Sequence, residues 1–188
     1  MQYAILPEHR VPDFSAGCAK CELGCHRSRM IWGEGQPGAP LLVLLDNPGA
    51  REDRRGVPFL CGTRRTLQEL AVQAGIGLEE MYITFVVKCR PTKAYDKKQA
   101  RTTCLDYFHW QIAEHRPQVL FALGNVSIHA LLHDESAEVK TMRCHWHNWS
   151  GIPLAVSYHP LAVRRRPGLF RFALQDWIMV TRQIKRNE

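Results

Sequence analysis

Short, continuous apolar runs dominate the hydrophobic pattern of the chain, and each of them is followed by a polar or turn-forming residue. The four runs cover residues 41–45, 81–87, 119–123 and 154–158. Consecutive rather than alternating apolar residues are typical of parallel strands that are buried on both faces. Apolar residues at helical spacing predict helices over 63–74, 97–115 and 170–184, and a further helix that Asn125 caps and that continues through Leu132.

This alternation of strands and helices predicts βαβ units, and therefore a parallel sheet covered by helices on both faces. We expect a three-layer α/β/α fold with a central four-stranded parallel sheet. The chain has 188 residues, which suits one domain over residues 1–188. Its apolar content of 45% and charged content of 23% are typical of a soluble globular protein.

Polar side chains follow the first and the fourth predicted strands. Asp46 and Asn47 precede Pro48-Gly49, and His159 precedes Pro160. Open α/β sheets bind ligands just beyond the carboxyl ends of their strands. A carboxylate, an amide and an imidazole there suit cleavage of a bond whose transition state places positive charge on a sugar. The same residue types also form ordinary turns, so the pattern alone leaves both interpretations open.

Four cysteines form two pairs, Cys18 with Cys21 and Cys89 with Cys104. Brought together, they offer four sulfurs, enough for a tetrahedral zinc ion or an iron–sulfur cluster. The alternative is four unrelated buried thiols. The chain has seven cysteines, an odd number that argues against a disulfide framework. Of the other three, Cys25 is interpreted as a spare residue near the pairs, and Cys61 and Cys144 are interpreted as core thiols.

The chain has a formal net charge of +7, which favours a polyanionic partner. Arginines gather after both strand-end motifs, at Arg51, Arg54, Arg55, Arg64 and Arg65 and again at Arg164, Arg165 and Arg166. This pattern predicts either a phosphate-binding rim or a solvated basic face. We find no apolar stretch that could span a membrane and no signal-peptide pattern, so we expect a cytoplasmic monomer.

Taken in order, these motifs resemble those of the uracil-DNA glycosylase superfamily, and most closely its family 4, the iron–sulfur branch. The resemblance covers nearly the whole chain. It rests on Cys18-x-x-Cys21 with Arg29 and Gly33-Glu34-Gly35, on Pro48-Gly49-x-x-Glu52-Asp53 with Gly56-Val57-Pro58-Phe59, on Val87-Lys88-Cys89-Arg90-Pro91 with Cys104, on Ala122-Leu123-Gly124, and on Tyr158-His159-Pro160. It implies that DNA is the partner and that Cys18, Cys21, Cys89 and Cys104 hold a [4Fe-4S] cluster, with zinc as the alternative.

The resemblance also implies roles for individual side chains. Such enzymes flip the target base into a pocket, where Phe59 would stack on it. Asp46 and Asn47 would stabilise the sugar cation and orient water, with Asp46 the favoured base, and His159 would donate a hydrogen bond to the departing base. Basic residues of the rim would contact DNA, namely Arg64, Arg164 and Arg165.

Three departures from the family pattern bear on which base is cleaved. Asp46-Asn47 replaces the usual Glu-Ala or Glu-Gly, and Cys61 and Arg64 replace small residues. Phe85 occupies the position of the Asn that hydrogen-bonds the uracil edge, which removes that readout. We therefore expect a DNA glycosylase for a damaged or modified base other than uracil, such as a hypermodified phage pyrimidine, with a role in antiviral defence. The alternatives are a uracil-DNA glycosylase of base excision repair, a catalytically silent lesion-binding protein and an iron–sulfur electron carrier.

Overall fold

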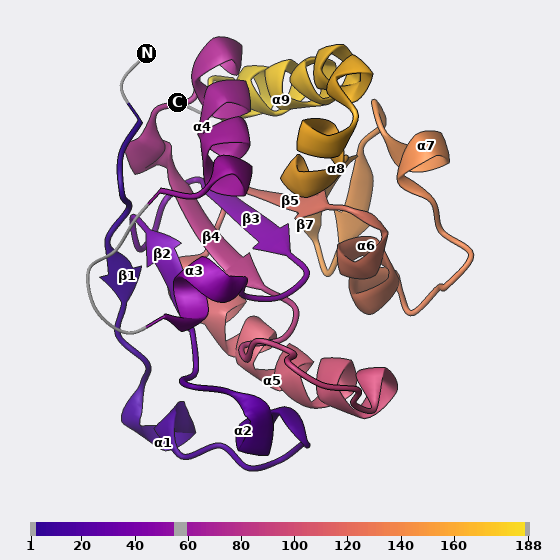
Figure 1. Cartoon of the computed structure of the whole chain (residues 1–188). Helices are drawn as coiled ribbons and strands as arrows, with labels where there is room; N and C mark the ends of the chain where they lie inside the picture. Colours follow the sequence, from indigo (N-terminus) through magenta and orange to yellow (C-terminus); the bar gives the residue numbers. More distant parts are fainter. Residues whose placement is uncertain (1–2, 55–59, 187–188) are drawn as a thin grey trace.

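The structure is a computed structural model that describes residues 3–54 and 60–186. A single mixed sheet of seven strands organises this part of the chain. The strand order is β1-β2-β4-β3-β5-β7-β6 (Figure 1). The four central strands are mutually parallel, namely β4 (Met81–Phe85), β3 (Leu41–Leu45), β5 (Val119–Leu123) and β7 (Ile152–Ser157). These are the four strands that the apolar runs predict, so the parallel core of the sheet is confirmed.

The sheet has three further strands that the hydrophobic pattern does not predict. They are antiparallel and lie at the two edges, namely β1 (Glu8–His9), β2 (Gly33–Gly35) and β6 (His147–Trp149). Each is only two or three residues long and none contains an apolar run. Of these, β1 and β6 are edge strands, whereas β2 pairs with both β1 and β4, and none of the three is long enough for periodicity to reveal it.

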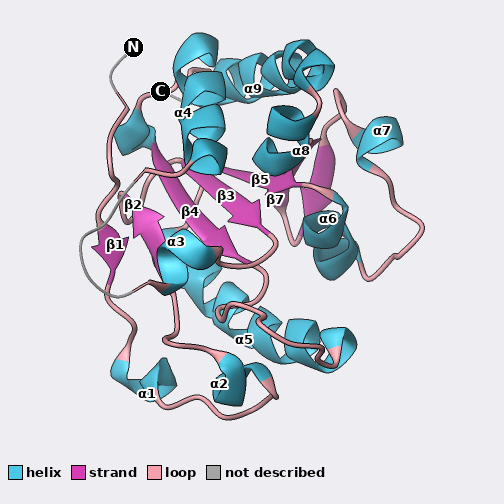
Figure 2. Cartoon of the chain, viewed as in Figure 1, coloured by secondary structure: helices cyan, strands magenta, loops and turns pink. Residues whose placement is uncertain are grey.

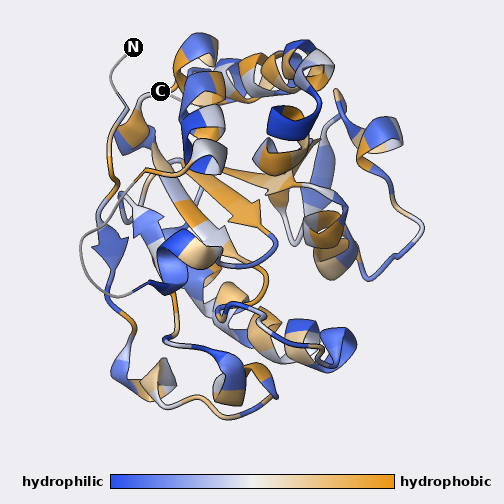
Figure 3. Cartoon of the chain, viewed as in Figure 1, coloured by the Kyte–Doolittle hydropathy of each residue, from blue (hydrophilic) through white to orange (hydrophobic). Residues whose placement is uncertain are grey.

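Side chains of the central strands alternate between two hydrophobic cores, one on each face of the sheet. In β3, Leu41, Val43 and Leu45 face one core, whereas Leu42 and Leu44 face the other. Both sets are almost fully buried. Figure 3 shows that the hydrophobic residues of the sheet gather in the central strands. Burial on both faces is the reason that these strands appear in the sequence as unbroken apolar runs.

Helices cover both faces of the sheet, which gives the three layers expected (Figure 2). One face is covered by α4 (Gly62–Ala74), α8 (Pro160–Arg165) and α9 (Phe170–Ile184), and the other by α5 (Lys97–His115) and α6 (Asn125–Leu132). The remaining short helices are α1 (Asp13–Ala16), α2 (Leu23–His26), α3 (Ala50–Asp53), α7 (Val139–Met142), η1 (Leu78–Glu80) and η2 (Pro167–Leu169).

The predicted boundaries are close to the observed ones. The helices α5 and α9 have the predicted limits, whereas α6 begins at Asn125 itself, with Gly124 as its N-cap residue. The second predicted strand ends two residues early, at Phe85. Within the described ranges, no helix is long and apolar enough to cross a bilayer.

Candidate active site and cysteine centre

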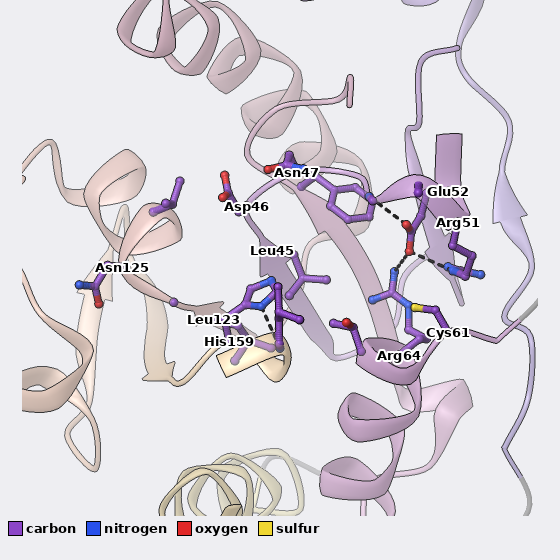
Figure 4. Close-up of a pocket in the computed structure, with 17 residues that line it drawn as sticks. Leu45, Asp46, Asn47, Arg51, Glu52, Cys61, Arg64, Leu123, Asn125 and His159 are labelled. Carbon is purple, nitrogen blue, oxygen red and sulfur yellow. Dashed lines mark hydrogen bonds and ion pairs between the residues drawn. The ribbon is translucent and has the colours of Figure 1, made fainter. Parts of the chain in front are cut away.

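A cavity of about 510 Å³ opens at the carboxyl ends of the parallel strands (Figure 4). Its floor comes from the residues that end or follow these strands: Leu45, Asp46 and Asn47 after β3, Phe85 in β4, Leu123 and Gly124 after β5, and His159 after β7. The helices α3 and α4 supply the other wall. The structure therefore brings Asp46, Asn47 and His159 to one pocket, although the two motifs are about 110 residues apart in the sequence.

Asp46 and Asn47 are half-buried at the end of β3. Burial raises the pKa of the Asp46 carboxyl, and the positive charges of Arg101 and Lys97 partly oppose this effect. The amide nitrogen of Asn47 donates to the carbonyl of Pro48 at 2.8 Å. The amide oxygen is then the end of the side chain that can accept from a water molecule. This pair offers one carboxylate and one acceptor amide to the same side of the pocket.

His159 is held as a neutral hydrogen-bond donor. Its Nδ1 accepts from the backbone N–H of Leu161 at 3.1 Å, so in the neutral ring Nε2 carries the proton. Burial, together with the nearby charge of Arg64, lowers the pKa of His159 to about 4. Gly124 permits this placement, because it has a φ of +95° and a Cβ there would lie 3.0 Å from the Cβ of His159.

Phe85 lines the pocket with only 2% of its surface exposed. Its ring can pack against a base but offers no hydrogen bond to a base edge. Its carbonyl accepts from the Nζ of Lys88 at 2.8 Å, and Lys88 also bonds Thr84 and Gln111. Lys88 is fully buried, and burial lowers its pKa to about 7. This lysine connects the pocket floor to the neighbouring cysteines.

A buried cluster of two carboxylates and two guanidinium groups forms the second wall. Glu52 Oε1 accepts from Arg51 Nε and from Arg64 Nη2, each at 3.0 Å, while Glu34 forms ion pairs with the same two arginines. Burial alone would raise the pKa of Glu52, but the charges of Arg64 and Arg51 outweigh it and hold that pKa below its usual range. The four charges balance, which is the condition for keeping them buried.

This cluster changes the interpretation of Arg64. The sequence suggested an exposed contact to DNA, but only 2% of Arg64 is exposed and its guanidinium pairs with Glu34 and Glu52. Arg64 therefore belongs to the pocket wall and not to an exposed rim. The sequence placed Arg51 in the same basic rim, but its side chain is also buried and paired. It assigned no role to Glu34 or Glu52, although acidic residues inside the Gly33-Glu34-Gly35 and Pro48-to-Asp53 motifs were the available signal.

Arg164 and Arg165 are exposed in the last turn of α8, next to the pocket residues His159 and Leu161. The side chain of Arg164 crosses the start of α4, where a Cβ on Gly62 would lie 2.5 Å from Arg164 Nε. The basic rim predicted after the second motif thus borders the pocket. Phe59, expected to stack on the base, lies outside the described residues.

The four paired cysteines converge below this pocket. Cys89 and Cys104 are buried in the core cluster against which Cys18 and Cys21 pack. Burial raises the pKa of the Cys89 thiol, and the charges of Cys21 and Cys18 add to that rise, as expected for close neighbours. Arg27 connects both pairs, donating to Cys89 Sγ at 3.2 Å and to the Cys18 carbonyl at 2.9 Å.

The donors around the four sulfurs bear on the two metal centres considered. One zinc ion with Zn–S bonds of about 2.3 Å would hold its thiolates about 3.8 Å apart. Among the described residues, no three cysteine sulfurs lie within 4.8 Å of one another. A four-iron cluster spreads its thiolates over a larger cube, and N–H donors such as Arg27 stabilise its sulfurs. Four thiols with an adjacent N–H donor therefore fit an iron–sulfur cluster.

Two of the remaining cysteines, Cys61 and Cys144, are not the core thiols that the sequence suggested. Cys144 is exposed, at a left-handed φ of 61°, and its Sγ donates to Asp176. Cys61 is half-buried and lines the pocket instead of the core. Cys25, interpreted as spare, is exposed. Both corrections arise because the turn before α4 and the loop before β6 carry these residues away from the sheet.

His9, Glu114 and His115 form a separate group whose ligand atoms lie within 4.8 Å of one another. However, His115 Nδ1 accepts from the N–H of Gly38 at 3.2 Å, and burial lowers the pKa of His115 to about 4. The neutral ring therefore carries its proton on Nε2, the atom that faces Glu114. A metal ion would need that nitrogen without its proton, so this group is a poor metal site.

Comparisons with known proteins agree with the fold and the motifs. The family model described as the uracil DNA glycosylase superfamily matches residues 32–178. The chain is 32% identical over 169 residues to a type-4 uracil-DNA glycosylase of Pyrobaculum aerophilum, covering 85% of this chain and 86% of that protein. It is 29% identical to the type-4 uracil-DNA glycosylase of Thermotoga maritima, covering 85% of each.

Among solved structures, the crystal structure of wild-type Pedobacter heparinus SMUG2 matches with a TM-score of 0.51 and 13% sequence identity. The match covers 79% of this chain and 76% of that chain. At this identity the likeness concerns the fold alone.

Proposed function

The chain belongs to the uracil DNA glycosylase superfamily, and on this basis we propose that it hydrolyses the N-glycosidic bond of a flipped base in DNA and leaves an abasic site. The observation that carries the proposal is the pocket at the carboxyl edge of the sheet, which joins Asp46, Asn47 and His159. The three groups face one cavity that is large enough for a base.

The chemistry assigns one group to each side of the bond. Asp46 and the amide oxygen of Asn47 orient a water molecule and stabilise positive charge on the sugar, with Asp46 accepting the proton of the water as its oxygen bonds to C1′. The C1′–N bond breaks, and its electron pair leaves with the base. His159 Nε2–H donates to the base as this negative charge develops.

The proposed substrate is a damaged or modified base other than uracil, such as a hypermodified pyrimidine of phage DNA. Phe85 supports this choice, because its buried ring lines the pocket where an amide would hydrogen-bond a uracil edge. A site that recognises a polar edge loses much of its discrimination when the recognising group is removed. Arg164 and Arg165 would contact the phosphates of the DNA beside the flipped nucleotide.

We further propose that Cys18, Cys21, Cys89 and Cys104 hold a [4Fe-4S] cluster. When bound, this group supplies structural cross-linking rather than a catalytic step. It would tie the segment from α1 to α2 to the end of β4 and to α5, next to the floor of the pocket.

The test is incubation with oligonucleotides that contain uracil, hypoxanthine, xanthine, hydroxymethylcytosine or glucosylated hydroxymethylcytosine. We expect release of at least one modified base, with uracil a poorer substrate. Robust uracil release that is unchanged by Phe85→Asn would refute the non-uracil assignment. Binding to such DNA without any release would support the alternative of a catalytically silent lesion-binding protein.

A further inference from the structure

Arg64 is a buried, charged side chain in the wall of the pocket. It is the third residue of α4, its side chain is 3% exposed, and it lines the same cavity as Phe85 and His159. Burying a guanidinium is costly unless it is paired, and arginine does not shed its charge. The chain therefore keeps a permanent positive charge at the site where a base would bind.

Two carboxylates fix the orientation of this guanidinium. Arg64 Nε lies 2.7 Å from Glu34 Oε1, and Nη2 donates to Glu52 Oε1 at 3.0 Å. Residues 3–54 and 60–186 form no hydrogen bond or ion pair with the other terminal nitrogen, Nη1. Figure 4 shows the unbonded end of the guanidinium pointing into the space between Leu45 and His159.

The groups around this space are complementary to a base that accepts hydrogen bonds. Nη1 of Arg64 and Nε2 of His159 both carry protons, whereas Phe85 contributes only a ring. We propose that Arg64 recognises the flipped base by donating from Nη1 to an oxo or anionic acceptor, the contact that the missing amide at Phe85 would otherwise provide. This inference rests on the proposed glycosylase function. It favours a base that presents a carbonyl oxygen or a deprotonated nitrogen to Arg64 over one that presents an amino group there.

The same contact would assist the reaction. As the C1′–N bond breaks, its electron pair spreads from the ring nitrogen onto the oxo group of the departing base. A fixed cation beside that oxygen stabilises the transition state, and it transfers no proton because the guanidinium stays charged. Its charge also helps to lower the pKa of His159. The departing base is therefore stabilised by one cation, Arg64, and by one neutral hydrogen-bond donor, His159.

The test compares Arg64→Gln with the double variant Arg64→Gln/Glu34→Gln. The single variant leaves two carboxylates with Arg51 alone, whereas the double variant restores the balance of charge and guards against misfolding. Arg182→Gln, an exposed arginine of α9, is the control for loss of one positive charge. In single-turnover assays with enzyme in excess, both Arg64 variants should lose about a hundredfold or more in rate. The control should keep the wild-type rate.

A second readout separates recognition of the base from a purely structural role. Uracil is compared with 5-fluorouracil, and hypoxanthine with xanthine, because the second base of each pair is more acidic and leaves more easily. The loss caused by Arg64→Gln should be smaller for the more acidic base. Equal losses within a pair or an unchanged rate would overturn the inference while leaving glycosylase activity in place. A wild-type protein that releases no base overturns the proposed function itself.

Discussion

Replacing His159 should change how the stability of the protein depends on pH. In the folded protein, burial and the charge of Arg64 lower the pKa of His159 to about 4, from 6.5 for an unperturbed histidine. Between these two values the unfolded chain binds the proton and the folded protein does not. The contribution of His159 to the free energy of unfolding is therefore fully present above pH 6.5 and is lost as the pH falls toward 4.

The expected magnitude is about 3 kcal/mol, at about 1.4 kcal/mol for each tenfold difference in proton affinity. His115 has a similarly lowered pKa, caused by burial and by His9 and Lys88, so it should contribute a comparable loss over the same range. His159→Gln should remove about half of the pH dependence of the wild-type protein. His159→Gln/His115→Gln should flatten most of it.

The assay is urea unfolding followed by tryptophan fluorescence at pH 7.5, 6.5, 5.5 and 4.5, with the linear extrapolation to water at each pH. Base release measured at the same pH values should fall as His159 takes up its second proton, because protonation breaks the hydrogen bond from Leu161. Protonation of Asp46, whose pKa is raised by burial, should lower it as well. If the free energy of unfolding of His159→Gln depends on pH as that of the wild-type protein does, the neutral, buried state of His159 is refuted.

Three further outcomes are expected. Phe85→Asn restores a polar edge to the pocket. On the oligonucleotide panel it should raise the rate of uracil release relative to the rate for the base that the wild-type protein prefers. An unchanged ratio of these two rates would count against Phe85 as a determinant of base specificity. Cys89→Ser should abolish absorbance at about 400 nm in the purified protein and lower its stability. A colourless wild-type protein with one zinc ion would show the cluster assignment to be wrong. Arg164→Ala should weaken DNA binding with little change in stability, and Gly62→Ala, which displaces the Arg164 side chain but keeps its charge, should weaken it less. Full wild-type affinity in Arg164→Ala would contradict the role of Arg164 in binding DNA.

The sequence was sufficient for the parallel core, because burial on both faces leaves a direct signature in runs such as Leu41–Leu45. It was not sufficient for the antiparallel strands β1, β2 and β6, which are too short to show any period. The convergence of Asp46 with His159 was also predictable, because the carboxyl ends of parallel strands share one edge of the sheet.

The burial of Arg64 in the charged wall of the pocket could not be predicted from the sequence, because arginine is usually exposed and no neighbouring residue marks Arg64 as buried. Its burial depends on Glu34 in β2 and Glu52 in α3, two carboxylates from distant segments that meet only in the fold. For the same reason the sequence could pair the cysteines by motif, yet only the structure shows Arg27 bonded both to Cys89 and to the Cys18 carbonyl.

The most direct test of glycosidic cleavage in this pocket is abasic-site formation by the wild-type protein and by Asp46→Ala/Asn47→Ala. Both proteins are incubated with the oligonucleotide that releases most base, the product is cleaved with alkali, and DNA affinity is measured on the same substrate. We predict alkali-labile sites with the wild-type protein and almost none with the double variant, at similar DNA affinity. Abasic sites formed equally by both proteins would contradict the assignment of the reaction to this pocket.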